Sequence, residues 1–200
     1  MMLTTDTDEQ ALNLEEGWIC LDFANTGIRG DDIHDVGEVI EWAREIGLVY
    51  NEESDQLIRK AGEAPAEAER AVAESRRQRK LLRRVFGAIA ADESPADADL
   101  KTLNGHLNEA FAQLRLVPTD EGYQLGWTEW TAVDCVLWPV VKSAADLLCS
   151  EDLHRIGQCA AADCDWLFLD TSKNRSRRWC SMRRCGNRAK VQRYLERRAS

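Results

Sequence analysis

Residues 159–200 read CAAADCDWLFLDTSKNRSRRWCSMRRCGNRAKVQRYLERRAS, and the rest of the chain is organised around them. They hold two close cysteine pairs, Cys159/Cys164 and Cys180/Cys185, with four residues inside each pair and fifteen between the pairs. Structural Zn²⁺ sites are closed by four ligands at tetrahedral vertices, and thiolates suit the ion well. The spacing therefore predicts one structural Zn²⁺ held by the four cysteines, with no open position for catalysis.

The same thiolates could hold an iron–sulfur cluster, or could remain reduced without a metal. The aromatic and basic residues around them give no reason to favour redox chemistry. The remaining cysteines, Cys20, Cys135 and Cys149, lie among apolar residues with no thiol or histidine close in sequence. We expect each of these three to act as a small buried hydrophobic side chain.

The segments between the ligands predict a treble-clef-like order of knuckle, hairpin, knuckle and helix. Residues 166–169, WLFL, read as a strand, and residues 177–179, RRW, are expected to return as its partner. A helix is expected after Cys185, with Val191 and Leu195 four residues apart on its inner face. A module of this size buries little apolar surface, so metal binding is expected to supply much of its folding energy.

The charge of the chain is divided unevenly along the sequence. The net charge is −9, but residues 171–200 hold eleven Lys/Arg and one Glu, which gives +10 and leaves −19 for the other 170 residues. A basic segment of this kind indicates a polyanion partner, and the arginine fork matches phosphate or guanine. Docking of the basic segment on the acidic part of the chain is the alternative. The predicted nucleic-acid contacts are Lys173, Arg175, Arg177, Arg178, Arg183, Arg184, Arg188, Lys190, Arg193 and Arg197.

The chain before this segment is predicted to be mostly helical. Asp35 and Glu38 resemble a capping box before a helix that ends at Gly47. Pro65 is expected to open a helix to about residue 91, whose core stripe includes Leu81 and Phe86. The remaining predicted helices cover about 53–61, 94–114 and 131–149, with Pro139 kinking the last helix or beginning a new one.

Residues 115–128 change pattern and predict a β-hairpin with its turn at residues 119–122. The fold class is therefore α+β, with a mostly helical N-terminal domain at 1–152 and a small four-cysteine zinc finger at 153–200. The short boundary between the two implies that they pack together.

Polar residues follow the apolar patch at residues 18–21, where periodicity does not separate helix from strand. Asp22, Asn25 and Thr26 are candidates for a small ligand pocket, or for turn caps that satisfy buried backbone groups. No catalytic constellation stands out, because the three histidines lie in unrelated contexts and no phosphate-binding loop occurs. The sequence therefore predicts a protein that is not an enzyme.

The N-terminal residues are polar and acidic, without the apolar region of a secretory signal. The longest apolar run, residues 135–141, is too short to cross a membrane. We expect a cytoplasmic protein with no membrane partner, whose cysteines are reduced.

Residues 166–190, WLFLDTSKNRSRRWCSMRRCGNRAK, closely resemble the C-terminal CGNR zinc finger, named for the four residues at 185–188. The chain before them resembles the ABATE domain of stress-induced bacterial transcription regulators, through CLDFANT at 20–26, residues 39–48, and WPVVKSAADLL at 138–148. The resemblance implies a zinc-binding, DNA-binding module with a helical regulatory domain, and it places the family's metal ligands on the four cysteines.

The sequence thus favours a zinc-dependent DNA-binding transcriptional regulator whose acidic N-terminal domain senses a small molecule or a protein. A zinc-scaffolded protein-interaction module and an RNA-binding protein are the alternatives. The helix expected at 65–91 could also form a homodimer.

Overall fold

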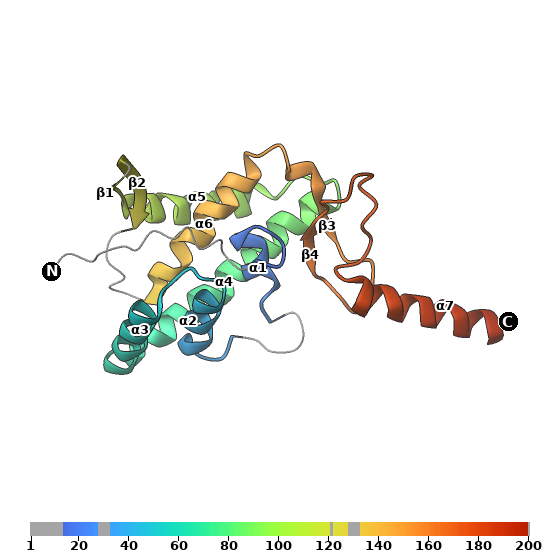
Figure 1. Ribbon diagram of the computed structural model, residues 1–200, viewed down its shortest axis with the longest axis horizontal. Helices are drawn as coiled ribbons and strands as arrows, with labels where there is room; N and C mark the ends of the chain where they lie inside the picture. Colours follow the sequence, from blue (N-terminus) through green and yellow to red (C-terminus); the bar gives the residue numbers. More distant parts are fainter. Residues whose placement is uncertain (1–13, 28–32, 121, 128–132, 200) are drawn as a thin grey trace.

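The computed structural model describes residues 14–27, 33–120, 122–127 and 133–199, and its longest helix, α4 (Pro65–Ala90), runs through the centre (Figure 1). Pro65 occupies the first turn, where its missing N–H leaves no hydrogen bond unmade. Of the predicted core stripe, Leu81, Leu82, Val85 and Phe86 are buried, and Ile89 is partly buried against the same core. Helix α4 therefore forms the axis on which most of the other elements pack.

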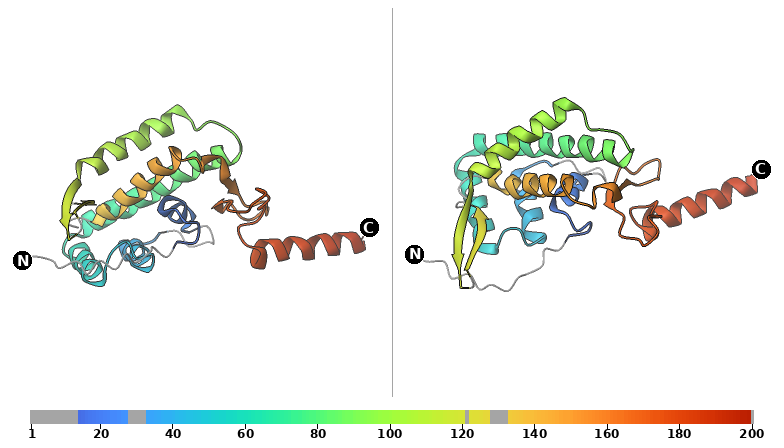
Figure 2. Two further views of the ribbon diagram at one scale, coloured as in Figure 1. Left: turned by 45° about the horizontal axis from the view of Figure 1, so that its top comes forward. Right: turned by 90° about the horizontal axis from the view of Figure 1, so that it is seen from above.

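Five helices surround this axis. Figure 2 shows α5 on one side of the pair formed by α4 and α6, and α1, α2 and α3 on the other side. Their bounds are α1 Ile19–Asn25, α2 Val36–Glu45, α3 Asn51–Glu63, α5 Asp97–Ala112 and α6 Leu137–Leu148. The segment that periodicity left undecided is thus the helix α1, and its residues from Cys20 to Asn25 are all buried.

The predicted ends of α2 are confirmed with one change. The Asp35 carboxylate accepts the Glu38 N–H at 3.1 Å, as an N-cap does. The Glu38 carboxylate, however, accepts from the N–H of His34 at 2.8 Å, one residue before the cap. Gly47 follows the helix with φ at +80°, the conformation that glycine adopts at little cost.

The starts of α5 and α6 refine the expected ranges. Helix α5 begins at Asp97, three residues after the expected start, and its N-cap residue Ala96 makes no side-chain cap hydrogen bond. The acidic residues Asp97 and Asp99 occupy the first turn instead, where the helix dipole favours them. A short 3₁₀ turn, η1 (Val133–Val136), precedes α6, and Pro139 lies in the first turn of α6, so the proline marks a new helix. The part of the expected range at 128–132 lies outside the described residues.

The predicted hairpin is present as β1 (Leu114–Thr119) and β2 (Gly122–Trp127), paired antiparallel with Leu116 opposite Leu125. One residue of the predicted turn, at position 121, lies outside the described residues. The ring of Trp127 lies 6.0 Å from that of Trp138 on α6, which anchors the base of the hairpin to the helices.

The C-terminal hairpin differs from the prediction in its strand pairing. A 3₁₀ turn, η2 (Leu153–Arg155), leads into β3 (Ile156–Gln158), which pairs antiparallel with β4 (Leu167–Leu169). The strand expected at 177–179 is absent, although the Arg178 carbonyl accepts one hydrogen bond from Ala160 at 2.9 Å. The Asp170 carboxylate accepts from the backbone of Ser172 and Arg177 at 2.8 and 2.9 Å, so a side chain closes this loop without a strand ladder.

The remaining elements are a π-helical turn, η3 (Met182–Gly186), and the helix α7 (Asn187–Ala199), which projects away from the rest of the molecule (Figure 1). We call residues 14–152 the body and residues 153–199 the finger. The fold is the predicted α+β arrangement, a mostly helical region with a hairpin followed by a four-cysteine cluster with its own hairpin and helix. The boundary at residues 152 and 153 remains a prediction.

Strand β4 belongs to two cores at once. Leu167 and Leu169 are buried in the large core of the body, together with Ile156 from β3. Trp166 and Phe168, which point to the opposite side, are buried in a second cluster with the cysteines. Strand β4 therefore joins the hydrophobic core of the finger to that of the body.

Candidate metal centre and its basic surround

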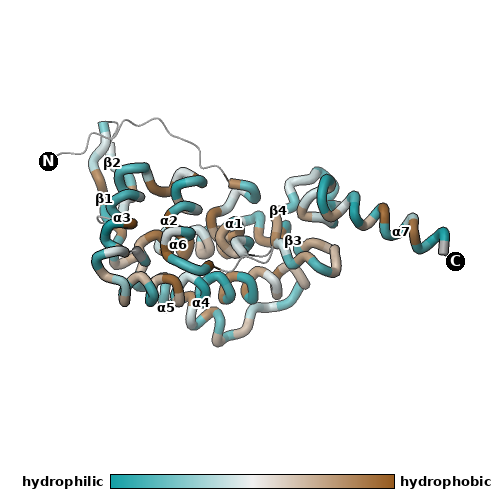
Figure 3. The backbone as a smooth tube through the Cα atoms, turned by 90° about the horizontal axis from the view of Figure 1, so that it is seen from below, coloured by the Kyte–Doolittle hydropathy of each residue, from teal (hydrophilic) through white to brown (hydrophobic). Residues whose placement is uncertain are grey.

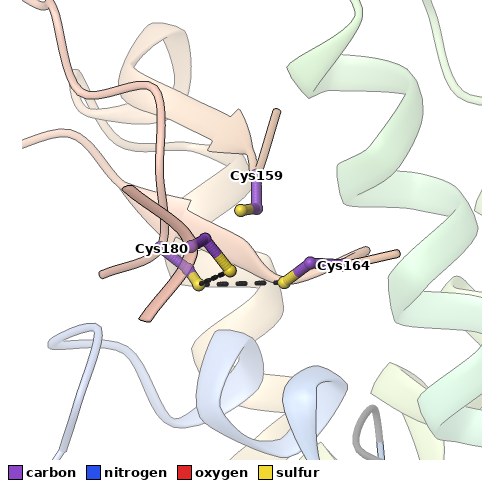
Figure 4. A group of neighbouring side chains, drawn as sticks. Cys159, Cys164 and Cys180 are labelled. Carbon is purple, nitrogen blue, oxygen red and sulfur yellow. Dashed lines mark hydrogen bonds between the residues drawn. The ribbon is translucent and has the colours of Figure 1, made fainter. Parts of the chain in front are cut away.

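The four cysteines of the finger come from both of its halves. Cys159 directly follows β3, Cys164 precedes Trp166, Cys180 precedes η3, and Cys185 lies within η3. Their sulfur atoms all lie within 4.8 Å of one another. In Figure 4 the sulfurs of Cys159, Cys164 and Cys180 point toward a common space.

The spacing of these sulfur atoms fits a zinc ion. A tetrahedron with Zn–S bonds of about 2.3 Å has edges of about 3.8 Å. The Sγ atoms of Cys164 and Cys180 are 3.7 Å apart, and those of Cys180 and Cys185 are 3.6 Å apart. The donor set is four thiols with no water-bearing position, which is the composition of a structural site.

Burial disfavours ionisation of two of these thiols, whereas at Cys159 the effect of burial is outweighed by hydrogen bonds from the backbone of Cys180 and Ala161, which lower the pKa. Burial raises the pKa of the Cys164 thiol to about 11, and burial together with the neighbouring thiols raises the pKa of Cys180. A bound Zn²⁺ supplies positive charge that replaces the thiol protons and brings both halves of the finger to one point.

The residues after Cys185 support the metal site from outside. The Arg188 guanidinium makes an ion pair with Asp163 at 2.7 Å and donates to the Cys185 sulfur at 3.5 Å, so it joins the two knuckles. A Cβ atom at Gly186 would lie 2.7 Å from the Met182 sulfur and 3.3 Å from the Trp179 ring. Within residues 185–188, Cys185 is a metal ligand, Gly186 allows a close contact with Met182 and Trp179, and Arg188 connects the two cysteine pairs. We call the contacts of Arg188 with Asp163 and Cys185 the brace.

An arginine on the finger loop is held by the body. Both terminal nitrogens of Arg177 donate to the carboxylate of Glu16, at 2.9 and 3.0 Å. The Glu16 side chain is 3% exposed and also accepts from the Trp166 indole at 3.0 Å and from the Leu169 N–H at 3.3 Å. Burial raises the pKa of Glu16, while the hydrogen bonds from Arg177 and Trp166 act in the opposite direction.

Arg177 also binds the finger's own backbone. Its side chain donates to the carbonyls of Leu169, Trp179 and Cys180, and the guanidinium lies 4.4 Å from the centre of the Phe168 ring. We call the set of Glu16, Arg177 and their partners the latch. Sequence reasoning placed Arg177 among the nucleic-acid contacts and did not single out Glu16, because no local pattern relates residues this far apart.

The two parts of the chain match two known families. Residues 17–151 match a profile named ABATE, described as "Putative stress-induced transcription regulator". The chain belongs to the ABATE family. Residues 155–198 match the CGNR zinc finger, so the architecture expected from the sequence is confirmed. No curated protein matches the chain.

The profiles and the sulfur cluster together support one structural zinc in this ABATE protein. The descriptions of the two families name a regulator and a zinc finger, and neither description names an enzyme. None of the helices in the described ranges is long and apolar enough to cross a membrane.

The predicted nucleic-acid contacts fall into two groups. Arg177 and Arg188 are engaged in the latch and the brace. The other eight are exposed, on the loop, on η3 and on α7, at the end of the ABATE protein away from its hairpin (Figure 1). Among the described residues, several of these make no ion pair: Lys173, Arg175, Arg183, Arg184 and Lys190.

Helix α7 is more exposed than predicted. Val191, Tyr194 and Leu195 are 58%, 56% and 59% exposed, so Val191 and Leu195 do not face the core of the finger. The helix starts at Asn187, two residues after the last ligand, and leads outward. Its inner residues line a groove of about 400 Å³ beside the segment 160–163. Figure 3 shows the apolar positions as brown segments along a mostly hydrophilic helix.

The candidate pocket residues of the ABATE region are hydrogen-bonded within the protein. Asp22 accepts from the N–H groups of Glu15 and Glu16 at 3.0 and 3.2 Å, and burial raises its pKa to about 6. Asn25 donates to the Leu167 carbonyl at 2.8 Å and accepts from the Leu167 N–H at 2.9 Å, so its amide pairs with β4 as a strand would. Thr26 donates to the Phe23 carbonyl at 2.7 Å.

These three residues also border a cavity of about 260 Å³ between α1, α2 and Trp166. Their role in binding a ligand remains a prediction. Of the other three cysteines, Cys20 and Cys135 are buried as expected. Cys149 is exposed, because it follows α6 at the surface.

Proposed function

We propose that this protein is a zinc-dependent DNA-binding transcription regulator, in which the finger binds DNA and the body senses a ligand or partner. The observation that carries the proposal is the set of exposed cations arranged around the metal centre. Because Zn²⁺ joins the two halves of the finger, it also fixes the loop, η3 and α7 relative to one another. The family description supports a regulatory role.

Phosphate contacts are expected to dominate the affinity. Each phosphate neutralised by Lys or Arg contributes about 0.9 to the slope of log K against log salt. We therefore expect binding of a 20-base-pair duplex to weaken steeply as salt rises, measured by fluorescence anisotropy on the zinc-loaded protein.

The sharpest variant changes Arg175, Arg183 and Arg184 to Gln, since these side chains are exposed and unpaired within the described residues. Arg177 is left intact because its loss would disturb the latch. A matched control changes three exposed cations of the body, Arg59, Lys80 and Lys101, to Gln. We expect the finger triple to lower the salt slope by up to about 3 and the control to leave it unchanged. Equal slopes in the two triples, or no duplex binding at low salt, would contradict the proposal.

A protein-interaction module is a second candidate, favoured by the exposed apolar residues of α7, Val191, Tyr194 and Leu195. Competition experiments with duplex DNA, single-stranded RNA and unlabelled protein show whether the finger binds DNA, RNA or protein. A homodimer remains a prediction, tested by the mass of the protein in sedimentation.

A further inference from the structure

A cavity lies where the body meets the finger. Helix α1 lies between α2 and β4 (Figure 1), and the cavity of about 260 Å³ opens along its C-terminal half. Its walls come from α1, α2, the segment before α1 and the segment before β4. The lining residues are Glu15, Asp22, Asn25, Thr26, Trp42, Glu45, Ile46 and Trp166.

The charge of this lining is entirely negative. Glu15, Asp22 and Glu45 are acidic, and no Lys or Arg is among the lining residues. Asp22 is 9% exposed, and each of its oxygens accepts one backbone hydrogen bond, which leaves further lone pairs available. Three carboxylates around one cavity repel anions and raise the local concentration of cations.

Two aromatic residues are also among the lining residues. Trp42 and Trp166 line the cavity, and tryptophan is the aromatic side chain that attracts a cation most strongly over its face. The carboxylates do not converge as metal ligands would, since the four cysteines form the one cluster with ligand spacing in the described part of the chain. Aromatic and acidic walls without such convergence fit an organic cation better than a metal ion.

We propose that this cavity binds a small alkylammonium ion, with its charge near the carboxylates and its alkyl groups against the tryptophan rings. The proposal names the ligand class for the sensing role proposed above, and only its regulatory consequence rests on that proposed function. The consequence follows from contact: Asn25 pairs with β4, and Trp166 donates to Glu16 of the latch. A cation in the cavity thus touches two residues that join the body to the finger.

The direct test is calorimetric titration of the zinc-loaded full chain with tetramethylammonium at pH 7.5. Its neutral analogue of similar shape, tert-butanol, and the anion pivalate serve as comparisons. We expect saturable binding of tetramethylammonium, at least tenfold weaker binding of tert-butanol and none of pivalate. Similar affinities for the cation and the neutral analogue, or no saturable binding of the cation, would overturn the proposal.

Variants locate the site. Glu45→Gln removes one exposed carboxylate of the lining, and Glu41→Gln is the matched control on the same helix, where Glu41 pairs with Arg44 outside the cavity. We expect affinity to fall about threefold to tenfold in Glu45→Gln and not in Glu41→Gln. Trp42→Leu keeps the position apolar but removes the ring, with an expected loss of about tenfold, the range of a cation–π contact. Equal affinities in Glu45→Gln and Glu41→Gln would place any binding elsewhere.

The regulatory consequence has its own readout, the duplex affinity with and without saturating tetramethylammonium. Cation binding without duplex binding would leave the cavity proposal standing and remove the proposed function. Duplex binding without cation binding would leave the proposed function standing and remove the cavity proposal.

Discussion

Arg177 joins parts of the chain that lie far apart in the sequence. Its guanidinium is paired with Glu16 from the body and with three carbonyls of the finger. A Lys at this position could not reproduce the contacts, because an ammonium lacks the planar fork that meets both carboxylate oxygens. Arg177, which makes hydrogen bonds to both parts of the chain, therefore has a structural role in the basic segment.

Replacement of Arg177 by Ala is expected to destabilise the zinc-loaded protein by roughly 3 kcal/mol, since it leaves the Glu16 carboxylate buried without its partner. Arg175→Gln on the same loop is the control, and we expect a change within about 0.5 kcal/mol because Arg175 is exposed. Urea unfolding followed by circular dichroism measures both. Equal losses in the two variants would show that the latch does not stabilise the fold.

At the scale of elements, local sequence patterns predicted the positions of most helices but not the contacts between segments that lie far apart in the sequence. Proline, glycine and capping residues act within one turn, so α2 and α4 could be predicted with nearly correct ends. The partner of β4 could not, because β3 is three residues long and carries no alternating pattern. The cysteine cluster was predictable from spacing, whereas Glu16 and Asn25 act on the finger across more than 140 residues.

The β3–β4 pair depends on one glycine. Gly157 lies opposite Phe168, and a Cβ atom there would be 2.8 Å from the Phe168 ring, which is 1% exposed. Gly157→Ala is therefore expected to cost about 1–3 kcal/mol through overpacking.

Gly87→Ala is the matched control, because a Cβ at Gly87 in α4 meets nothing within 4 Å. Alanine favours a helix interior, so this change is expected to stabilise the protein by up to about 1 kcal/mol. Thermal unfolding should shift in opposite directions for the two variants. A neutral Gly157→Ala would show that the strands separate easily.

At the scale of the whole molecule, metal binding in the finger contributes to the stability of the body, because β4 packs in the cores of both parts. Loss of zinc releases Cys159 and Cys164, which lie in the segment between β3 and β4, and β4 in turn carries Leu167 and Leu169 into the body's core. The acidic body and the basic finger are thus coupled through packing as well as charge.

Chelation of zinc is expected to reduce hydrogen-exchange protection in α1, which holds β4 through Asn25, more than in α5. The Cys164→Ser variant should reproduce the effect of the chelator. Cys149→Ser is the control, since Cys149 is exposed and lies outside the cluster. Unchanged protection of α1 in the metal-free protein, at a measured content of about one zinc in the untreated protein, would contradict the coupling.

Because α7 projects from the metal site, a small rotation of the helix at Cys185 moves its far end by a large distance. Thirteen helical residues extend about 20 Å from the last metal ligand. A tilt of about 10° at the base would move the far end, near Arg197, by about 3.4 Å, the rise between successive nucleotides on one DNA strand. A tilt of this size at the base would thus shift the basic end of the helix by about the axial rise of one nucleotide.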